Sequence, residues 1–152
     1  MAFYQLHKEI LLKGSLDEVW NFISSPENLK KITPDYLGFD IETKNLPKEI
    51  YPGLVIQYKV SPILGIKMTW VSEITQMRQK AFFVDRQLIG PYKLWHHQHI
   101  LKETNDGILM TDIVSYQPPY AFLASIVNRL FIQKKLHEIF AHRSAVMLNI
   151  FK

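Results

Sequence analysis

Two histidines one residue apart are the side chains of this sequence most able to do chemistry. His97 and His99 lie in the stretch 92–103, where side-chain types alternate as they do along a β-strand. Strand side chains point alternately to two faces, so Trp95, His97 and His99 share one face and His96 lies on the other. An imidazole beside a carboxylate can exchange protons near neutral pH or orient a polar ligand.

The next strand predicts which carboxylate meets these histidines. A four-residue turn over 104–107, indicated by Asn-Asp-Gly, sets the pairing of strand 92–103 with strand 108–117. Asp112 and Tyr116 therefore join the histidine face. The predicted cross-strand pairs are Glu103 with Ile108, Leu101 with Met110, His99 with Asp112, His97 with Val114, and Trp95 with Tyr116.

The turn before strand 92–103 leaves the other neighbour open. Pairing Ile89 with Tyr92 adds Val84 and Arg86 to the histidine face, whereas a turn centred on Gly90 adds Asp85 and Phe83. The two pairings differ by one residue in register, and such a change moves every side chain of the strand to the opposite face. The residues around this turn do not decide between the two pairings.

Three interpretations of the histidine face follow. The side chains form structural hydrogen bonds across the sheet, orient a ligand, or act as acid and base in a reaction. His97, His99 and Asp112 could also supply three ligands to a zinc or iron ion. No further metal motif accompanies them, and His-x-His on a strand is often structural, so we predict no bound metal and no cofactor.

The elements that must position this face follow from periodicity and turn residues. Residues 3–12 alternate as a strand, and Ser15 with Glu18 forms a capping box for a short helix that stops before Pro26. A second short helix is predicted from Pro26 to about residue 31. Six further strands are predicted at 38–43, 54–60, 66–75, 81–88, 92–103 and 108–117, and one long helix at 120–151.

Short connections make the strands antiparallel, and the sheet must bury its inner face against the long helix, which predicts an α+β fold. We expect Tyr58, Trp70, Phe82 or Phe83, and Trp95 to form an apolar wall, completed by Leu130, Phe131 and Phe140 of the helix. The helix charges Arg129, Lys135 and Arg143 are expected in solvent, with the alternative that one enters the cavity to meet an anionic ligand head.

Composition excludes several classes of protein. The 152 residues contain no cysteine, which rules out disulfides and thiolate sites and fits a cytoplasmic protein. The net charge of +4 is dispersed, so we expect no nucleic-acid partner. No apolar stretch is long enough to span a bilayer, so we expect no stable membrane insertion. Phosphate-binding glycine loops and the common hydrolase motifs are absent.

Several motifs accompany this order of elements. They are the run Ser15-Leu16-Asp17-Glu18-Val19-Trp20, the run Phe83-Val84-Asp85-Arg86-Gln87, Gly90-Pro91-Tyr92, Trp95, His97, His99, Thr111-Asp112, Tyr116 and Pro118. The order of elements resembles the SRPBCC superfamily of helix-grip domains, which includes START lipid-transfer domains, pollen-allergen-like proteins and polyketide cyclases. The resemblance covers essentially the whole chain, and the motifs look like those of an uncharacterised bacterial ligand-binding branch.

The resemblance implies one domain over residues 1–152, with a curved seven-stranded sheet and a cavity between the sheet and the C-terminal helix. It favours Asp85 on the histidine face. We expect binding or carriage of a hydrophobic small molecule, without turnover. A polyketide cyclase or aromatase type of enzyme, and an interaction domain with a collapsed cavity, are the alternatives. The expected ligand-binding residues are Tyr58, Trp70, Asp85, Trp95, His97, His99, Asp112 and Tyr116.

Overall fold

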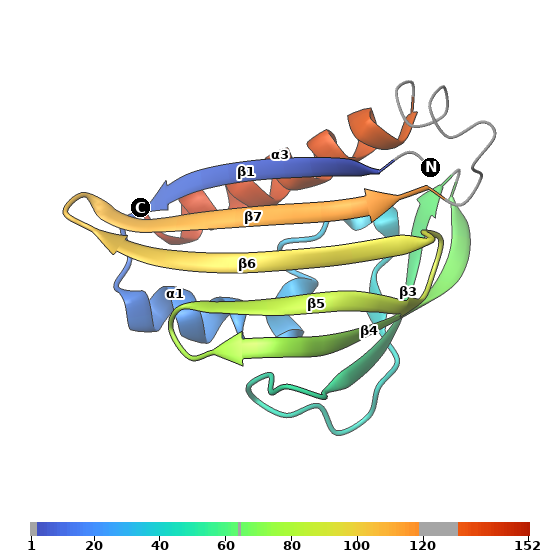
Figure 1. The fold of residues 1–152 in the computed structure, drawn as a ribbon, viewed down its shortest axis with the longest axis horizontal. Helices are drawn as coiled ribbons and strands as arrows, with labels where there is room; N and C mark the ends of the chain where they lie inside the picture. The colour runs from blue at the N-terminus through green and yellow to red at the C-terminus, as the bar shows by residue number, and fades with distance from the viewer. Residues whose placement is uncertain (1–2, 64, 119–130) are drawn as a thin grey trace.

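One antiparallel sheet of seven strands dominates the computed structural model, which describes residues 3–63, 65–118 and 131–152. The strand order in the sheet is β1-β7-β6-β5-β4-β3-β2, so the first and last strands of the chain are neighbours (Figure 1). The strands are β1 (Tyr4–Leu12), β2 (Asp40–Ile41), β3 (Val55–Ile63), β4 (Ile66–Arg78), β5 (Phe82–Ile89), β6 (Leu94–Thr104) and β7 (Gly107–Gln117). The predicted set of seven strands is confirmed, although the predicted strand at 38–43 is only two residues long.

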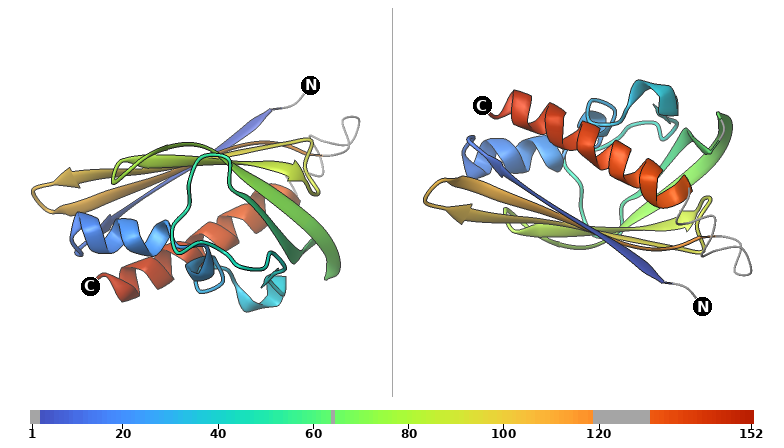
Figure 2. Two further views of the ribbon diagram at one scale, coloured as in Figure 1. Left: turned by 90° about the horizontal axis from the view of Figure 1, so that it is seen from below. Right: turned by 90° about the horizontal axis from the view of Figure 1, so that it is seen from above.

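The sheet curves around helices that all lie on one of its faces (Figure 2). Pairing of β4 with β5 shifts register between Val71 and Ser72 and again between Ile74 and Gln76. Such bulges bend a strand and increase its twist, which helps the sheet to curl. The concave face is therefore the one that the helices cover.

The segment between β1 and β2 folds as predicted in its first half. Helix α1 (Leu16–Ile23) begins at a capping box, in which Ser15 accepts from the amide of Glu18 and the Glu18 carboxylate accepts from the amide of Ser15. Pro26 opens the 3₁₀ turn η1 (Pro26–Leu29), where a second short helix is expected. A further 3₁₀ turn, η2 (Asp35–Leu37), was not predicted.

The closing helix α3 (Gln133–Ile150) lies diagonally across the concave face (Figure 2). The first part of the predicted helix 120–151, residues 120–130, lies outside the described residues. The buried side chains of α3 recur at helical spacing. They are Leu136, Phe140, Arg143, Ser144 and Met147. No helix among the described residues is long and apolar enough to cross a membrane.

The register that places the histidines is now settled. Every predicted pair of β6 with β7 is confirmed, including His99 with Asp112. On the other side, Asp85 pairs with His97, so Asp85 and not Arg86 joins the histidine face. A turn centred on Gly90 would pair Asp85 with Trp95, two residues before His97. Because side chains alternate with a period of two, both pairings put Asp85 on the histidine face.

Candidate ligand-binding site

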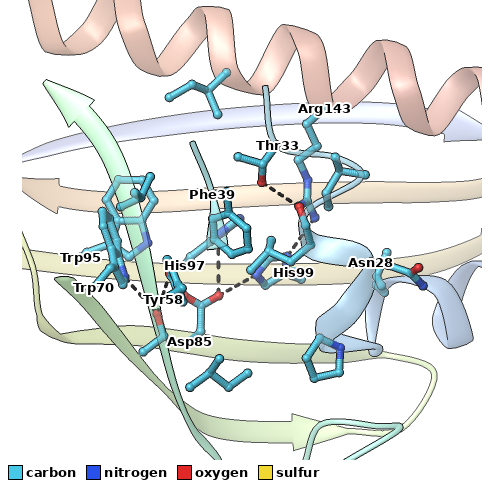
Figure 3. A pocket seen from close by; sticks show the side chains of 18 of the residues that line it. Asn28, Thr33, Phe39, Tyr58, Trp70, Asp85, Trp95, His97, His99 and Arg143 are labelled. Atoms are coloured by element: carbon cyan, nitrogen blue, oxygen red, sulfur yellow. Dashed lines mark hydrogen bonds and ion pairs between the residues drawn. The ribbon is translucent and has the colours of Figure 1, made fainter. Parts of the chain in front are cut away.

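A cavity of about 200 Å³, measured as space open to the centre of a water molecule, lies between the concave face, the segment of α1 to η2, and helix α3. It is large compared with the roughly 10–15 Å³ that one water molecule needs on this measure. Figure 3 shows its aromatic side chains gathered at one end and its charged side chains beside them, on strands β5 and β6 and on α3.

Aromatic rings form the wall at one end of the cavity. Trp70 meets Trp95 edge-on, with ring centroids 5.3 Å apart, and stacks on Tyr58 at 6.0 Å. The Ser72 hydroxyl connects Trp70 and Tyr58: it accepts from Trp70 Nε1 at 3.0 Å and lies 3.1 Å from the Tyr58 hydroxyl. Burial, and then the negative charge of Asp85, raise the pKa of Tyr58, so its hydroxyl stays protonated.

Five ionisable side chains from four elements form what we term the histidine cluster: Asp85 of β5, His97 and His99 of β6, Asp112 of β7, and Arg143 of α3. His97 Nε2 lies 2.9 Å from Asp112 Oδ1. His99 Nε2 lies 2.7 Å from Asp85 Oδ2. The imidazoles are adjacent, with centroids 3.7 Å apart.

Arg143 closes the cluster from the helix side. Its Nε donates to Asp112 Oδ2 at 3.2 Å, and its Nη2 lies 3.2 Å from His99 Nδ1. The side chain is buried, so the expectation of a solvated helix charge was wrong for this residue. The signal was present, because Arg143 lies seven residues after Leu136 and three after Phe140, on the same helical stripe.

Burial and charge act in opposite directions within the histidine cluster. Burial would raise the pKa of Asp112, but the Arg143 charge and hydrogen bonds from both histidines hold it well below its usual value. Burial would also raise the pKa of Asp85, but the hydrogen bond from His99 and the positive charges of the histidines and Arg143 outweigh it and lower the pKa. Both carboxyl groups are therefore ionised at neutral pH.

The two histidines differ in their titration. Burial and the neighbouring charge of His99 lower the pKa of His97, despite its bond to Asp112. Burial also opposes the charged form of His99, but contacts with Asp112 and Asp85 outweigh it and raise the pKa. A pair of groups whose pKa values are driven apart can perform two different tasks, one accepting a proton and the other keeping one.

A metal would find three candidate ligands here, but not the three that we considered from sequence. Within the described ranges, Asp85, His97 and His99 bring their ligand atoms within 4.8 Å of one another. Their donor chemistry suits zinc or iron. However, His99 Nε2 already bonds to Asp85, and the Arg143 guanidinium lies beside the same ring. The expectation of no bound metal stays a prediction.

The structure brings most of the expected site residues to the cavity. Two of the eight stand apart from its lining. Asp112 lies behind the histidines, and Tyr116 packs against Tyr4, Tyr92 and Trp95. The six that line the cavity are Tyr58, Trp70, Asp85, Trp95, His97 and His99.

The apolar wall departs from expectation on the helix side. Phe83 and Phe140 line the cavity as predicted, whereas Phe131 is 67% exposed and does not contribute. Leu130 and Arg129 lie outside the described residues. Phe39, Leu136 and Ile139 also line the cavity and were not predicted to do so. Phe39 falls within the strand predicted at 38–43, but the strand begins only at Asp40.

A curved seven-stranded antiparallel sheet closed by a C-terminal helix, with a cavity between them, defines the helix-grip fold. Solved structures of other proteins have the same fold. The chain is similar to ginseng major latex-like protein 151 from Panax ginseng, with a TM-score of 0.69 and 14% identity over 99% of this chain and 98% of that one.

Two further structures show the same similarity. Ara h 8.0201 gives a TM-score of 0.62 at 12% identity, covering 97% of this chain and 99% of that one. Protein Ms6760 from Mycobacterium smegmatis gives 0.64 at 16% identity, covering 93% and 89%. No protein-family model and no curated protein sequence matches the chain. At these identities the likeness establishes the fold alone.

Proposed function

We propose that this protein binds a hydrophobic small molecule in the cavity between the sheet and helix α3. The observation that carries the proposal is a largely apolar cavity with one charged cluster in its wall. Apolar contacts would supply most of the affinity, at about 0.8 kcal/mol for each CH₂ group buried, and the charged cluster would orient the ligand. An open cavity also favours this function over an interaction domain, for which we expect a collapsed one.

Blocking the cavity tests this proposal. Ile139 of α3 lines the cavity, so Ile139→Trp should fill part of it. We expect N-phenyl-1-naphthylamine, a neutral probe whose fluorescence rises in apolar surroundings, to bind the wild type and to bind this variant at least about 10-fold more weakly. Leu148→Trp adds the same ring at an exposed position of the same helix and should bind like the wild type. Equal binding by both variants would contradict the proposal.

An enzyme of polyketide cyclase or aromatase type is the second candidate. It is favoured by the contact of His97 with Asp112, because a carboxylate that fixes the tautomer of an imidazole also raises its basicity. Incubation with a cellular extract and mass spectrometry of bound and released compounds distinguish the two functions. We expect unchanged apolar compounds. A new product that is lost in folded His97→Ala and His99→Ala variants would establish the enzyme.

A further inference from the structure

Hydrogen-bond accounting within the histidine cluster fixes where the proton of His97 lies. Asp112 is ionised and accepts only, so the nitrogen that contacts it at 2.9 Å, His97 Nε2, must carry the hydrogen. Neutral His97 then presents a bare lone pair at Nδ1. His97 lines the cavity, and so does Asp85, the residue whose carboxylate is nearest to that nitrogen.

A second acceptor stands next to that lone pair. Asp85 Oδ2 lies 3.7 Å from His97 Nδ1, too far for a hydrogen bond, and it receives the Nε2–H of His99 instead. Among the described residues, none donates to Asp85 Oδ1 or to His97 Nδ1. The Asp85 side chain is 17% exposed and lines the cavity. The wall therefore carries two adjacent acceptors and no donor between them.

The positive charge of Arg143 does not compensate for this. Arg143 is the only Lys or Arg side chain among the described residues that line the cavity. Its Nε is bonded to Asp112 and its Nη2 is directed to His99. Two carboxylates face one guanidinium in the cluster, so the cluster carries no net positive charge even when His99 is protonated.

We propose that the polar end of the ligand is a hydrogen-bond donor, a hydroxyl or an amine, held between Asp85 and Nδ1 of His97, and that carboxylic acids are excluded. This inference rests on the proposed function and names its ligand class. An amine nitrogen placed between the two acceptors can lie about 2.8–3.0 Å from both and donate one hydrogen to each, whereas a hydroxyl has one hydrogen and donates to one of them. A ligand carboxylate would bring a third negative charge into the same apolar surroundings, where it must lose its hydration.

Matched probes that share one apolar body test the polar end alone. We would measure binding of 2-naphthol, 2-naphthylamine and 2-naphthoate to the full-length protein by calorimetry, with 1-octanol, octylamine and octanoate as an aliphatic series. The alcohol and amine should bind at least about 10-fold more tightly than the acid of the same series. Equal or tighter binding of the acid overturns this inference, whereas binding of no probe in either series counts against the proposed function itself.

A variant assigns the selectivity to Asp85. Asp85→Asn keeps the shape of the side chain, removes its charge and adds a donor, so the preference for alcohol over acid should fall about 10-fold or more. Glu73→Gln is the matched control, since Glu73 pairs with Arg86 away from the cavity, and it should keep the wild-type preference. An unchanged preference in folded Asp85→Asn would remove Asp85 from the site.

Zinc alone provides the remaining arm of the experiment. The acceptor pair would equally suit a cation, with His99 as a third ligand. We expect no saturable Zn²⁺ binding, because the short contact of His99 with Asp85 already occupies that nitrogen. Stoichiometric Zn²⁺ binding at about micromolar affinity that disappears in Asp85→Asn would show that the two acceptors hold a metal, and would overturn the proposal.

Discussion

At the scale of single residues, the contact of Arg143 with Asp112 decides whether the buried charges are tolerated. Both side chains are buried, at 7% and 4% exposure, and each is the other's counter-charge. Removing one partner leaves an uncompensated charge in an apolar interior, which is far more costly than losing an exposed ion pair.

We expect Arg143→Met to lower the free energy of unfolding by about 3–5 kcal/mol, measured by urea denaturation at pH 7. Lys134→Met, an exposed cation of the same helix, should change it by less than about 0.5 kcal/mol. Adding Asp112→Asn to Arg143→Met should cost less than the sum of the two single changes, because the second removes the stranded charge. Additive effects would mean that the two groups do not interact.

The histidines make a second prediction at this scale. As the pH falls, His99 should gain its proton before His97, because the pKa of His99 is raised above 6.5 and that of His97 is lowered below it. Two-bond ¹H–¹⁵N NMR spectra recorded across the titration would identify each charge state and should show the hydrogen of neutral His97 on Nε2. A His97 that protonates first would contradict the assignment.

These shifts also have opposite consequences for stability. The contribution of His99 is fully present below the unfolded-state pKa of about 6.5 and is lost as the pH rises through its folded-state pKa. His97 is neutral in the folded protein, so its contribution is present above about 6.5 and is lost as the pH falls towards its folded-state pKa. The two windows lie on opposite sides of about pH 6.5, so we expect the combined contribution to be greatest near that pH and to fall on either side in urea denaturation.

At the scale of elements, local patterns predicted what local physics determines. The capping box of Ser15 and Glu18 and the two-residue period of β6 and β7 depend on neighbouring residues, and both were predicted correctly. Two histidines and Asp112 could be placed on one face because an Asn-Asp-Gly turn leaves little freedom in register. The connection at Gly90-Pro91 is longer, and sequence left two registers open there.

What sequence did not provide was contact between elements distant in the chain. Arg143 reaches Asp112 from α3, 31 residues further along, and a charged residue within a helix is usually solvated. Only the curvature of the sheet brings β6, β7 and α3 together around one cavity. The aromatic wall at Tyr58 and Trp70 was predictable from residue type, but its place at one end of the cavity, beside the histidine cluster, was not.

At the scale of the whole molecule, α3 is both a wall of the cavity and a large part of the core. Leu136 and Phe140 pack against Val114 and Tyr116 of the sheet. Met147 belongs to the cluster around Trp20, at the other end of the helix. Helix α3 therefore packs into the core at both of its ends, which indicates that the chain should unfold as one cooperative unit.

Truncation after residue 119 tests this dependence. The shortened chain would expose the apolar concave face and leave the buried charge of Asp112 without its partner Arg143. It would also lose the 3.1 Å hydrogen bond from the Lys13 amide to the Phe151 carbonyl. We expect it to lack a cooperative urea transition and to show poorly dispersed amide resonances, whereas the full chain carried through the same procedure gives a single transition. Phe140→Ala in the full chain should cost about 3–5 kcal/mol, smaller than the loss of the whole helix. A truncated chain that unfolded cooperatively would show that the sheet is stable without α3, and that the helix serves only to close the cavity.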